Sequence, residues 1–235
     1  MIYFYKILGL ILIPLIKFNL HIRIKNKKES KKRYKERYGI TSLKKNYNKK
    51  LIWIHAASVG EFKSADFFIE NYYKKYNILI TTTTLSAANY AESNYGNKII
   101  HQFAPFDISI WVKKFLSNWD PIFIIWIESD LWPVTLDILN QQKRKAILVN
   151  ARMSPNSFNR WKRIQSFYSH LLKCFSVILA QSKLDRQRIN FLTERNIKFI
   201  GNLKFINKDI QTNKILDLKL NKNEKMLTLM IASSH

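Results

Sequence analysis

The chain has 235 residues, of which 47% are apolar and 24% are charged. This balance is typical of a globular protein, so disordered, collagenous and coiled-coil chains are excluded. The single cysteine, Cys174, excludes a disulfide framework and a cysteine-based zinc site, and its apolar neighbours indicate a small core residue. The five histidines never fall at ligand spacing, so we expect no metal site.

The net charge is high: 40 Lys and Arg against 16 Asp and Glu give +24. Such a field favours nucleic acid, an anionic membrane or phosphorylated ligands as partners. Nucleic acid is not expected as a partner, because the sequence contains none of the nucleic-acid-binding motifs and no aromatic-rich basic strand.

Residues 1–22 form an apolar segment that we expect to associate with a membrane. Its uninterrupted apolar run, residues 7–16, is only ten residues long, contains Pro14 and is flanked by Lys6 and Lys17. A spanning helix needs about 20 apolar residues, so the segment just crosses the membrane if both lysines snorkel, and otherwise lies in the interface. A cleaved signal peptide is the alternative, but a small-x-small cleavage site is missing and the next segment is basic.

Residues 23–50 are a basic juxtamembrane segment. Each basic residue near an anionic leaflet contributes about 1 kcal/mol, and an apolar anchor followed by a polybasic segment gives stable attachment. The positive-inside rule then places the globular part on the cytoplasmic face. The alternative is a solvated basic helix packed on the domain. The basic residues are Arg23, Lys25, Lys27, Lys28, Lys31, Lys32, Arg33, Lys35 and Arg37.

Residues 51–207 alternate between short apolar runs and segments with helical spacing. We expect Ser86 and Asp130 to cap the second and fourth helices. Strands that are apolar on both faces, with helices between them, predict an α/β, Rossmann-like, doubly wound parallel sheet. Strands are expected at 51–55, 77–83, 98–101, 121–127, 146–149, 176–180 and 198–200, and helices at 61–76, 86–95, 108–118, 130–141, 157–173 and 183–193.

Residues 208–235 differ in character from the sheet-forming part. Residues 208–225 are polar and rich in lysine, like a linker, and residues 226–231 are strand-like, followed by Ala232-Ser-Ser-His235. This predicts the first strand of a truncated second α/β domain. An extra edge strand on the first sheet is the alternative.

Ligands of such a sheet bind outside the carboxyl ends of its strands, so the segments that follow the strands are the candidate site. Glu61 ends the small-residue loop after the first strand, where it either caps the next helix or acts as a general base. Glu128 and Asp130 follow the most apolar strand, and two acids there are costly unless solvated, paired or used. Arg152 follows the next strand, where it either clamps an anion or forms a salt bridge with Glu128 or Asp130.

Weaker signals come from three other loops. The run from Thr81 to Thr84 offers hydroxyl groups for polar contacts, and Lys204 follows the last strand and reaches toward the same cleft. We interpret Asp107, in the segment Phe103-Ala-Pro-Phe-Asp107, as a turn residue.

Six motifs in this order resemble the N-terminal half of the 3-deoxy-D-manno-octulosonic acid (Kdo) transferases, the glycosyltransferases of lipopolysaccharide synthesis in Gram-negative bacteria. The resemblance extends over the whole chain, including the apolar, basic N-terminus. The motifs are His55-Ala-Ala-Ser-Val-Gly-Glu61, Thr81 to Thr84, Glu128-Ser-Asp-Leu-Trp-Pro133, Val149-Asn-Ala-Arg152, Leu179-Ala-Gln-Ser182 and Gly201-Asn-Leu-Lys204.

The resemblance implies a GT-B fold, with an N-terminal acceptor domain and a C-terminal donor domain at the inner membrane. It implies inverting transfer of Kdo from CMP-Kdo to the lipid A precursor, lipid IVA, without a cofactor. Glu61 would be the general base and Glu128 a second essential acid, with Arg152 and Lys204 as contacts for anionic groups. Ser58, Gly60, Thr83 and Asp130 complete the predicted substrate-binding set.

Two positions depart from the family pattern. Leu85-Ser-Ala87 replaces the usual Pro-Thr-Gly, which removes a preset turn at one edge of the acceptor site, and Val134 replaces the usual Asn. The largest departure is the truncated second domain, which leaves out nearly all of the donor site, so three functions compete. The chain is a Kdo transferase that needs a C-terminal half from a second polypeptide, a non-catalytic membrane-bound acceptor-binding module, or a basic membrane-surface glycosyltransferase with another donor.

Overall fold

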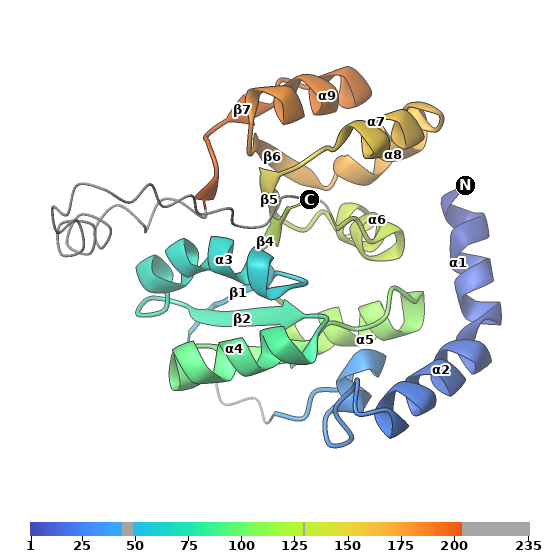
Figure 1. Cartoon of the computed structure of the whole chain (residues 1–235), viewed down its shortest axis with the longest axis vertical. Coiled ribbons are helices and arrows are strands. Elements are labelled where there is room, and N and C mark those ends of the chain that lie inside the picture. Colours follow the sequence, from blue (N-terminus) through green and yellow to red (C-terminus); the bar gives the residue numbers. More distant parts are fainter. Residues whose placement is uncertain (44–48, 129, 204–235) are drawn as a thin grey trace, which may run out of the picture. The chain divides into compact units, whose positions relative to one another are not determined.

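The computed structural model describes residues 1–43, 49–128 and 130–203, which form a seven-stranded sheet with helices on both faces (Figure 1). The strand expected at 226–231 lies outside these residues. The strands are β1 Leu51–His55, β2 Asn77–Thr82, β3 Ile100–Phe103, β4 Phe123–Ile127, β5 Ala146–Ala151, β6 Phe175–Ala180 and β7 Lys198–Phe199. The helices are α1 Ile2–Ile11, α2 Ile13–Lys25, η1 Tyr34–Tyr38, α3 Val59–Tyr72, α4 Leu85–Tyr95, η2 Gly96–Lys98, α5 Ser109–Trp119, α6 Pro133–Gln141, α7 Pro155–Lys162, α8 Gln165–Leu172 and α9 Lys183–Thr193.

The strand order is β3-β2-β1-β4-β5-β6-β7, and every described pair is parallel. The chain runs outward from β1 to β3 and then returns to start β4 on the other side of β1. The order therefore reverses between β1 and β4, where His55 pairs with Thr81 on one side and with Trp126 on the other. This is the doubly wound, Rossmann-like sheet that the sequence predicts.

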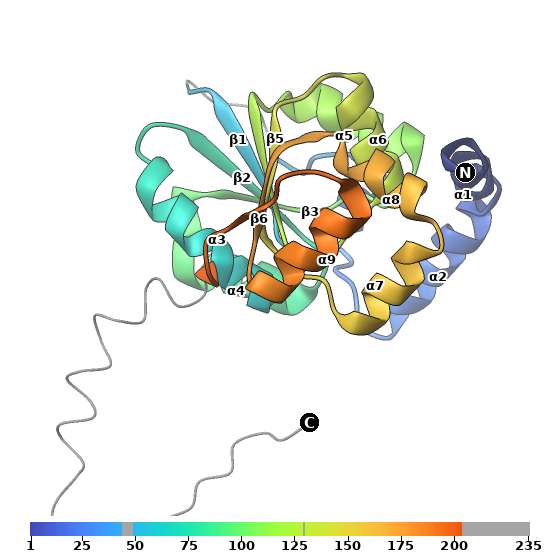
Figure 2. The same ribbon diagram turned by 90° about the horizontal axis from the view of Figure 1, so that it is seen from above.

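The two faces of the sheet bury different sets of apolar side chains. Leu51 and Trp53 point to the face covered by α5, α6, α8 and α9, whereas Ile52 and Ile54 point to the face covered by α3 and α4 (Figure 2). Successive residues of a strand point to opposite faces, so a strand that is apolar at every position is buried on both sides.

Three sequence-based expectations about helices are wrong. Thr84, not Ser86, caps α4, because its side chain accepts the amide of Ala87 at 3.2 Å. Asp130 does not cap α6, which begins at Pro133. The single helix expected at 157–173 is two helices, since the backbone leaves the helical region at Ile164 (φ −133°, ψ 43°).

Neither α1 nor α2 is long and apolar enough to span a membrane alone; together, bent by 59°, they have the length and composition to do so. The helix pair presents an apolar stripe to solvent. From Phe4 onward its members are spaced three or four residues apart, and all of them are between 57% and 76% exposed. They are Tyr3, Phe4, Ile7, Ile11, Leu15 and Phe18. Lys6 pairs with the buried carboxylate of Asp137 on α6.

Residues 26–43, which follow α2, are part of the folded domain. The short helix η1 packs against α5, and Gly39, at its end, takes a left-handed conformation (φ 68°). A Cβ at Gly39 would lie 2.2 Å from the carbonyl oxygen of Trp111, so only glycine fits. Arg37 is 4% exposed. Because this member of the basic run lies inside the fold, it cannot act as a membrane-facing cation.

Candidate functional site

The candidate site lies at the carboxyl ends of β1 and β4, where the strand order reverses. The loop from Ala56 to Ser58 follows β1, Thr83 follows β2 and Glu128 follows β4. Neighbouring parallel strands end at the same edge of the sheet, so these three segments converge there.

Glu61 closes a variant of the capping box at the start of α3, in which its carboxylate accepts the amide of the residue before the N-cap Ser58. The side chain of Ser58 accepts the amide of Glu61 at 3.3 Å, and Glu61 Oε2 accepts the amide of Ala57 at 2.6 Å. The capping role expected of Glu61 is therefore confirmed. The same hydrogen bond fixes the carboxylate over the end of β1, which is where a general base would be needed. Gly60, in the first turn of α3, is exposed.

Thr83 is bound to the loop that holds Glu61. Its amide and its hydroxyl both donate to the carbonyl oxygen of Ala57, at 3.0 and 2.8 Å. Ala57 thus accepts from Thr83 through its carbonyl and donates to Glu61 through its amide. The loops after β1 and β2 form one hydrogen-bonded unit.

His55 lies beneath this unit and is fully buried. Its Nδ1 lies 2.9 Å from the hydroxyl of Thr81, which also accepts the indole N–H of Trp53 at 2.8 Å. Its ring packs against those of Trp126 and Trp132, with centroids 4.2 and 4.6 Å away. Burial lowers the pKa of His55 to about 3, so it stays neutral and supports the loop rather than titrating at neutral pH.

Glu128 is held by Asn150, a residue for which the sequence analysis predicts no role. Both have left-handed backbones, with φ of 62° and 55°. The Asn150 amide donates to Glu128 Oε1 at 3.4 Å and to the hydroxyl of Ser64 on α3 at 3.3 Å, and its oxygen accepts the amide of Leu203 at 3.3 Å. Non-glycine residues with positive φ at strand ends are typical of functional loops.

The helix-capping role expected of Asp130 belongs to Asp107, interpreted above as a turn residue. The carboxylate of Asp107 accepts the amides of Val134 and Thr135, at 2.9 and 2.8 Å, and the hydroxyl of Thr135 at 2.7 Å. Desolvation raises the pKa of Asp107, and these hydrogen bonds oppose the rise. Asp130 itself is exposed and accepts the indole N–H of Trp132 at 3.2 Å, so its carboxylate remains accessible from solvent.

Glu128 and Arg152 line one open cavity of about 350 Å³. Its lining includes Ser154 and Ser157, the N-cap and first turn of α7, together with several apolar side chains. Arg152 is exposed and, within the described ranges, forms no salt bridge with Glu128 or Asp130. A guanidinium, two hydroxyls and a helix N-terminus are suited to an anionic group such as a phosphate or a carboxylate.

The remaining predicted site features are placed as follows. Glu61 is not among the residues that line this cavity. Lys204 lies outside the described residues. In the described part of the chain, no group of three or more His, Cys, Asp or Glu side chains could hold a metal ion.

A family model and two relatives point to the same family. Residues 32–207 match the family model described as 3-deoxy-D-manno-octulosonic-acid transferase (kdotransferase). The 3-deoxy-D-manno-octulosonic acid transferase of Rickettsia bellii is 37% identical over 98% of this chain and 56% of its own length. That of Rickettsia felis is 39% identical over 82% of this chain and 42% of its own length. The chain thus spans about half the length of these relatives.

Among solved structures, the UDP-N-acetylglucosamine 2-epimerase from Rickettsia bellii is similar to this chain. It has a TM-score of 0.45 and 11% sequence identity, over 74% of this chain and 52% of that one.

Proposed function

Because the chain belongs to the 3-deoxy-D-manno-octulosonic acid transferase family, we propose that it forms the acceptor side of an enzyme that transfers Kdo in lipopolysaccharide synthesis. The proposed donor is CMP-Kdo and the proposed acceptor is the lipid A precursor, lipid IVA. The donor site would be supplied by the part of the relatives that this chain does not span, either on the same polypeptide or on a separate one.

The observation that supports this proposal most is the placement of Glu61. Its carboxylate is held by the amide of Ala57, 2.6 Å away, at the switch point, the edge of the sheet between β1 and β4 where the strand order reverses. In the proposed reaction the acceptor hydroxyl oxygen bonds to the anomeric carbon of Kdo while the bond from that carbon to the CMP phosphate oxygen breaks. CMP leaves with the electron pair, Glu61 takes the hydroxyl proton, and the configuration inverts.

The cavity beside Glu128 is the proposed place for an anionic group of the acceptor. Arg152 would balance its charge, and the hydroxyls of Ser154 and Ser157 would donate to its oxygens. Asn150 would keep Glu128 turned toward the same space, at the 3.4 Å contact described above. Ser58, Gly60, Thr83 and Asp130 stay predicted substrate contacts, with Ser58 and Thr83 serving mainly to shape the loops.

We place the protein at the cytoplasmic face of the inner membrane. The solvent-facing apolar stripe of α1 and α2, from Tyr3 to Phe18, supports this localisation. Flotation with vesicles of anionic and of neutral phospholipid tests it. Replacement of Ile7, Ile11 and Leu15 by serine should abolish binding, and binding that survives this replacement would contradict the localisation.

The function is tested by co-expressing this chain with the C-terminal part of the Rickettsia bellii relative and supplying CMP-Kdo and lipid IVA. The proposal predicts a product heavier by one or more Kdo units. Binding of lipid IVA by this chain without transfer would favour the acceptor-binding module. Transfer from a different sugar donor would favour the third function. If the chain shows no binding of lipid IVA and no transfer, the family activity is refuted for this chain.

A further inference from the structure

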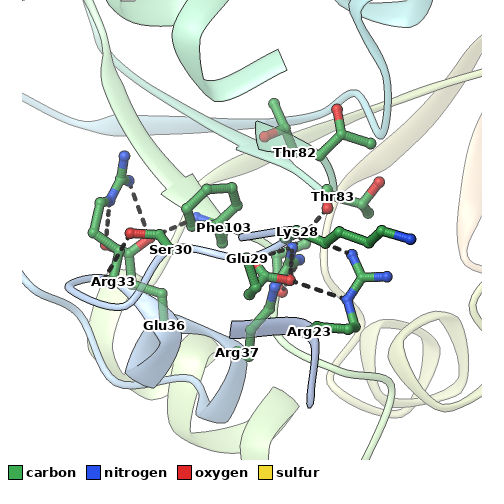
Figure 3. A network of polar contacts seen from close by, with 12 residues as sticks. Arg23, Lys28, Glu29, Ser30, Arg33, Glu36, Arg37, Thr82, Thr83 and Phe103 are labelled. Atoms are coloured by element: carbon green, nitrogen blue, oxygen red, sulfur yellow. Dashed lines mark hydrogen bonds and ion pairs between the residues drawn. The ribbon is translucent and has the colours of Figure 1, made fainter. Parts of the chain in front are cut away.

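The segment between α2 and β1 contains two arginines that reach the carboxyl ends of β2 and β3 (Figure 3). Arg33 forms a bidentate salt bridge with the carboxylate of Glu36, with contacts of 2.9 and 3.0 Å. It also donates to the carbonyl oxygen of His101 at 2.8 Å. Arg37 pairs with Glu29. Glu29 and Glu36 are the only acidic residues between positions 23 and 50 of a strongly basic stretch.

Arg37 is the more deeply buried of the two. Its Nη2 lies 3.0 and 3.1 Å from the two oxygens of Glu29, and both side chains are under 5% exposed. Its guanidinium packs over the ring of Phe103, 4.7 Å from the centroid. A charged pair at this depth is costly to desolvate, so its retention needs a structural or functional reason.

Arg37 also binds the backbone of the site loops. Nη2 donates to the carbonyl oxygen of Thr83 at 2.6 Å, and Nη1 donates to that of Ala104 at 3.2 Å. It therefore ties together the segments that follow β2 and β3. A planar guanidinium can hold several acceptors in fixed directions, which a lysine ammonium cannot do equally well.

The contact with Thr83 continues to Glu61. Thr83 donates through its amide and its hydroxyl to Ala57, and Ala57 donates to Glu61 Oε2 at 2.6 Å. An unbroken series of polar contacts thus runs from Glu29, four residues beyond the end of α2, to the carboxylate at the switch point.

We infer that Arg37 is a positioning residue for Glu61: through Thr83 and Ala57 it fixes the loop whose amide holds that carboxylate. The role in catalysis rests on the proposed function, whereas the positioning itself does not. The sequence analysis predicts that the basic segment after α2 binds the membrane. The inference gives it a second role, because Glu29 and Arg37 connect the end of α2 to the edge of the sheet where Glu61 lies.

Hydrogen exchange of this chain, measured by mass spectrometry in detergent micelles, tests the positioning without any activity. Arg37→Met leaves the buried carboxylate of Glu29 with only its longer contact to Arg23, at 3.7 Å. The main variant is therefore Glu29→Met with Arg37→Met, which removes both charges and keeps apolar volume. We expect amides in peptides covering Ala57 and Thr83 to exchange about tenfold faster or more, because local opening becomes easier, while those of β4 and β5 stay unchanged.

The matched control is Arg33→Met. It removes an arginine from the same segment, together with its ion pair to Glu36, without touching Thr83. The buried carboxylate of Glu36 keeps the amide of Phe103 and the hydroxyl of Ser42 as donors. Exchange around Ala57 should then stay at the wild-type rate. The inference is overturned if the double variant leaves these peptides unchanged, if it accelerates all peptides equally, or if Arg33→Met has the same effect as the double variant.

In the reconstituted transferase, the double variant should lower kcat by about tenfold or more at an unchanged KM for CMP-Kdo, because a misplaced base affects the chemical step and not donor binding. A rise in KM alone would contradict the link to Glu61. If the wild-type pair transfers no Kdo, the proposed function fails, while the exchange result still decides whether Arg37 positions the loop.

Discussion

Replacement of Asn150 gives a quantitative test of how the site is held together. Asn150→Ala removes three hydrogen bonds of 3.3 to 3.4 Å, to Ser64, Glu128 and Leu203. Each such bond contributes about 1 kcal/mol net at ordinary length, so these long ones together contribute roughly 2 kcal/mol. Alanine at φ 55° adds about 1 kcal/mol of backbone strain that asparagine tolerates. The free energy of unfolding should therefore fall by about 3 kcal/mol.

Asn150→Gly separates the two contributions. It loses the same hydrogen bonds but accepts the left-handed backbone, so it should be about 1 kcal/mol more stable than Asn150→Ala. Urea unfolding followed by circular dichroism in micelles measures both variants, provided that their m-values match that of the wild type. Two variants of equal stability, or an alanine variant within about 0.5 kcal/mol of wild type, would refute this account of Asn150.

Two further predictions concern stability. Asp107→Ala should lower the free energy of unfolding by about 2–3 kcal/mol, because α6 loses its cap and the hydroxyl of Thr135 loses its acceptor. Asp130→Ala should lower it by under about 0.5 kcal/mol. Urea unfolding that gives the two variants equal stability would contradict the assignment of the cap to Asp107. Burial lowers the pKa of His55 and of His101 to about 3, with Arg33 and Arg37 adding to the effect at His101, so only the unfolded state binds these protons between about pH 6.5 and 3. Stability present at neutral pH is therefore lost as the pH falls through that window, by roughly 1.4 kcal/mol per pH unit for each histidine. His101→Gln should remove one share of this slope.

The sheet and most helices followed from the sequence because their signals are local. The apolar run 51–55 and the helical spacing at 183–193 coincide with β1 and α9 residue for residue. The break at Ile164 has no proline or glycine to announce it. Helix propensity alone continues through such a sequence, and tertiary packing decides where the helix stops.

Only the parts of the site that depend on local sequence signals could be predicted. Glu61 and Ser58 are three residues apart, so their capping box is visible in the sequence. The cap of α6 comes from Asp107, which is 27 residues before Val134, and no local pattern shows such a contact. Asn150 does give a signal, since an asparagine inside an apolar strand end favours a left-handed turn.

The role of Arg37 was hidden by composition. The segment from Arg23 to Arg37 contains nine basic residues, and its composition predicts that each of them faces the membrane. The available clue is Glu29, an isolated acid eight residues earlier, which pairs with Arg37 in the fold. Buried arginines are almost always paired, so an acid in a basic stretch predicts which arginine turns inward.

The rate of Kdo transfer by the Glu61→Gln variant of the reconstituted enzyme tests the central claim most directly. A glutamine oxygen still accepts the amide of Ala57, so the capping box and the loop keep their geometry while the proton acceptor is lost. We expect kcat to fall by about 10² or more, with unchanged thermal stability and unchanged hydrogen exchange around Ala57. A variant that folds equally well and transfers Kdo at the wild-type rate would show that Glu61 is only a helix cap.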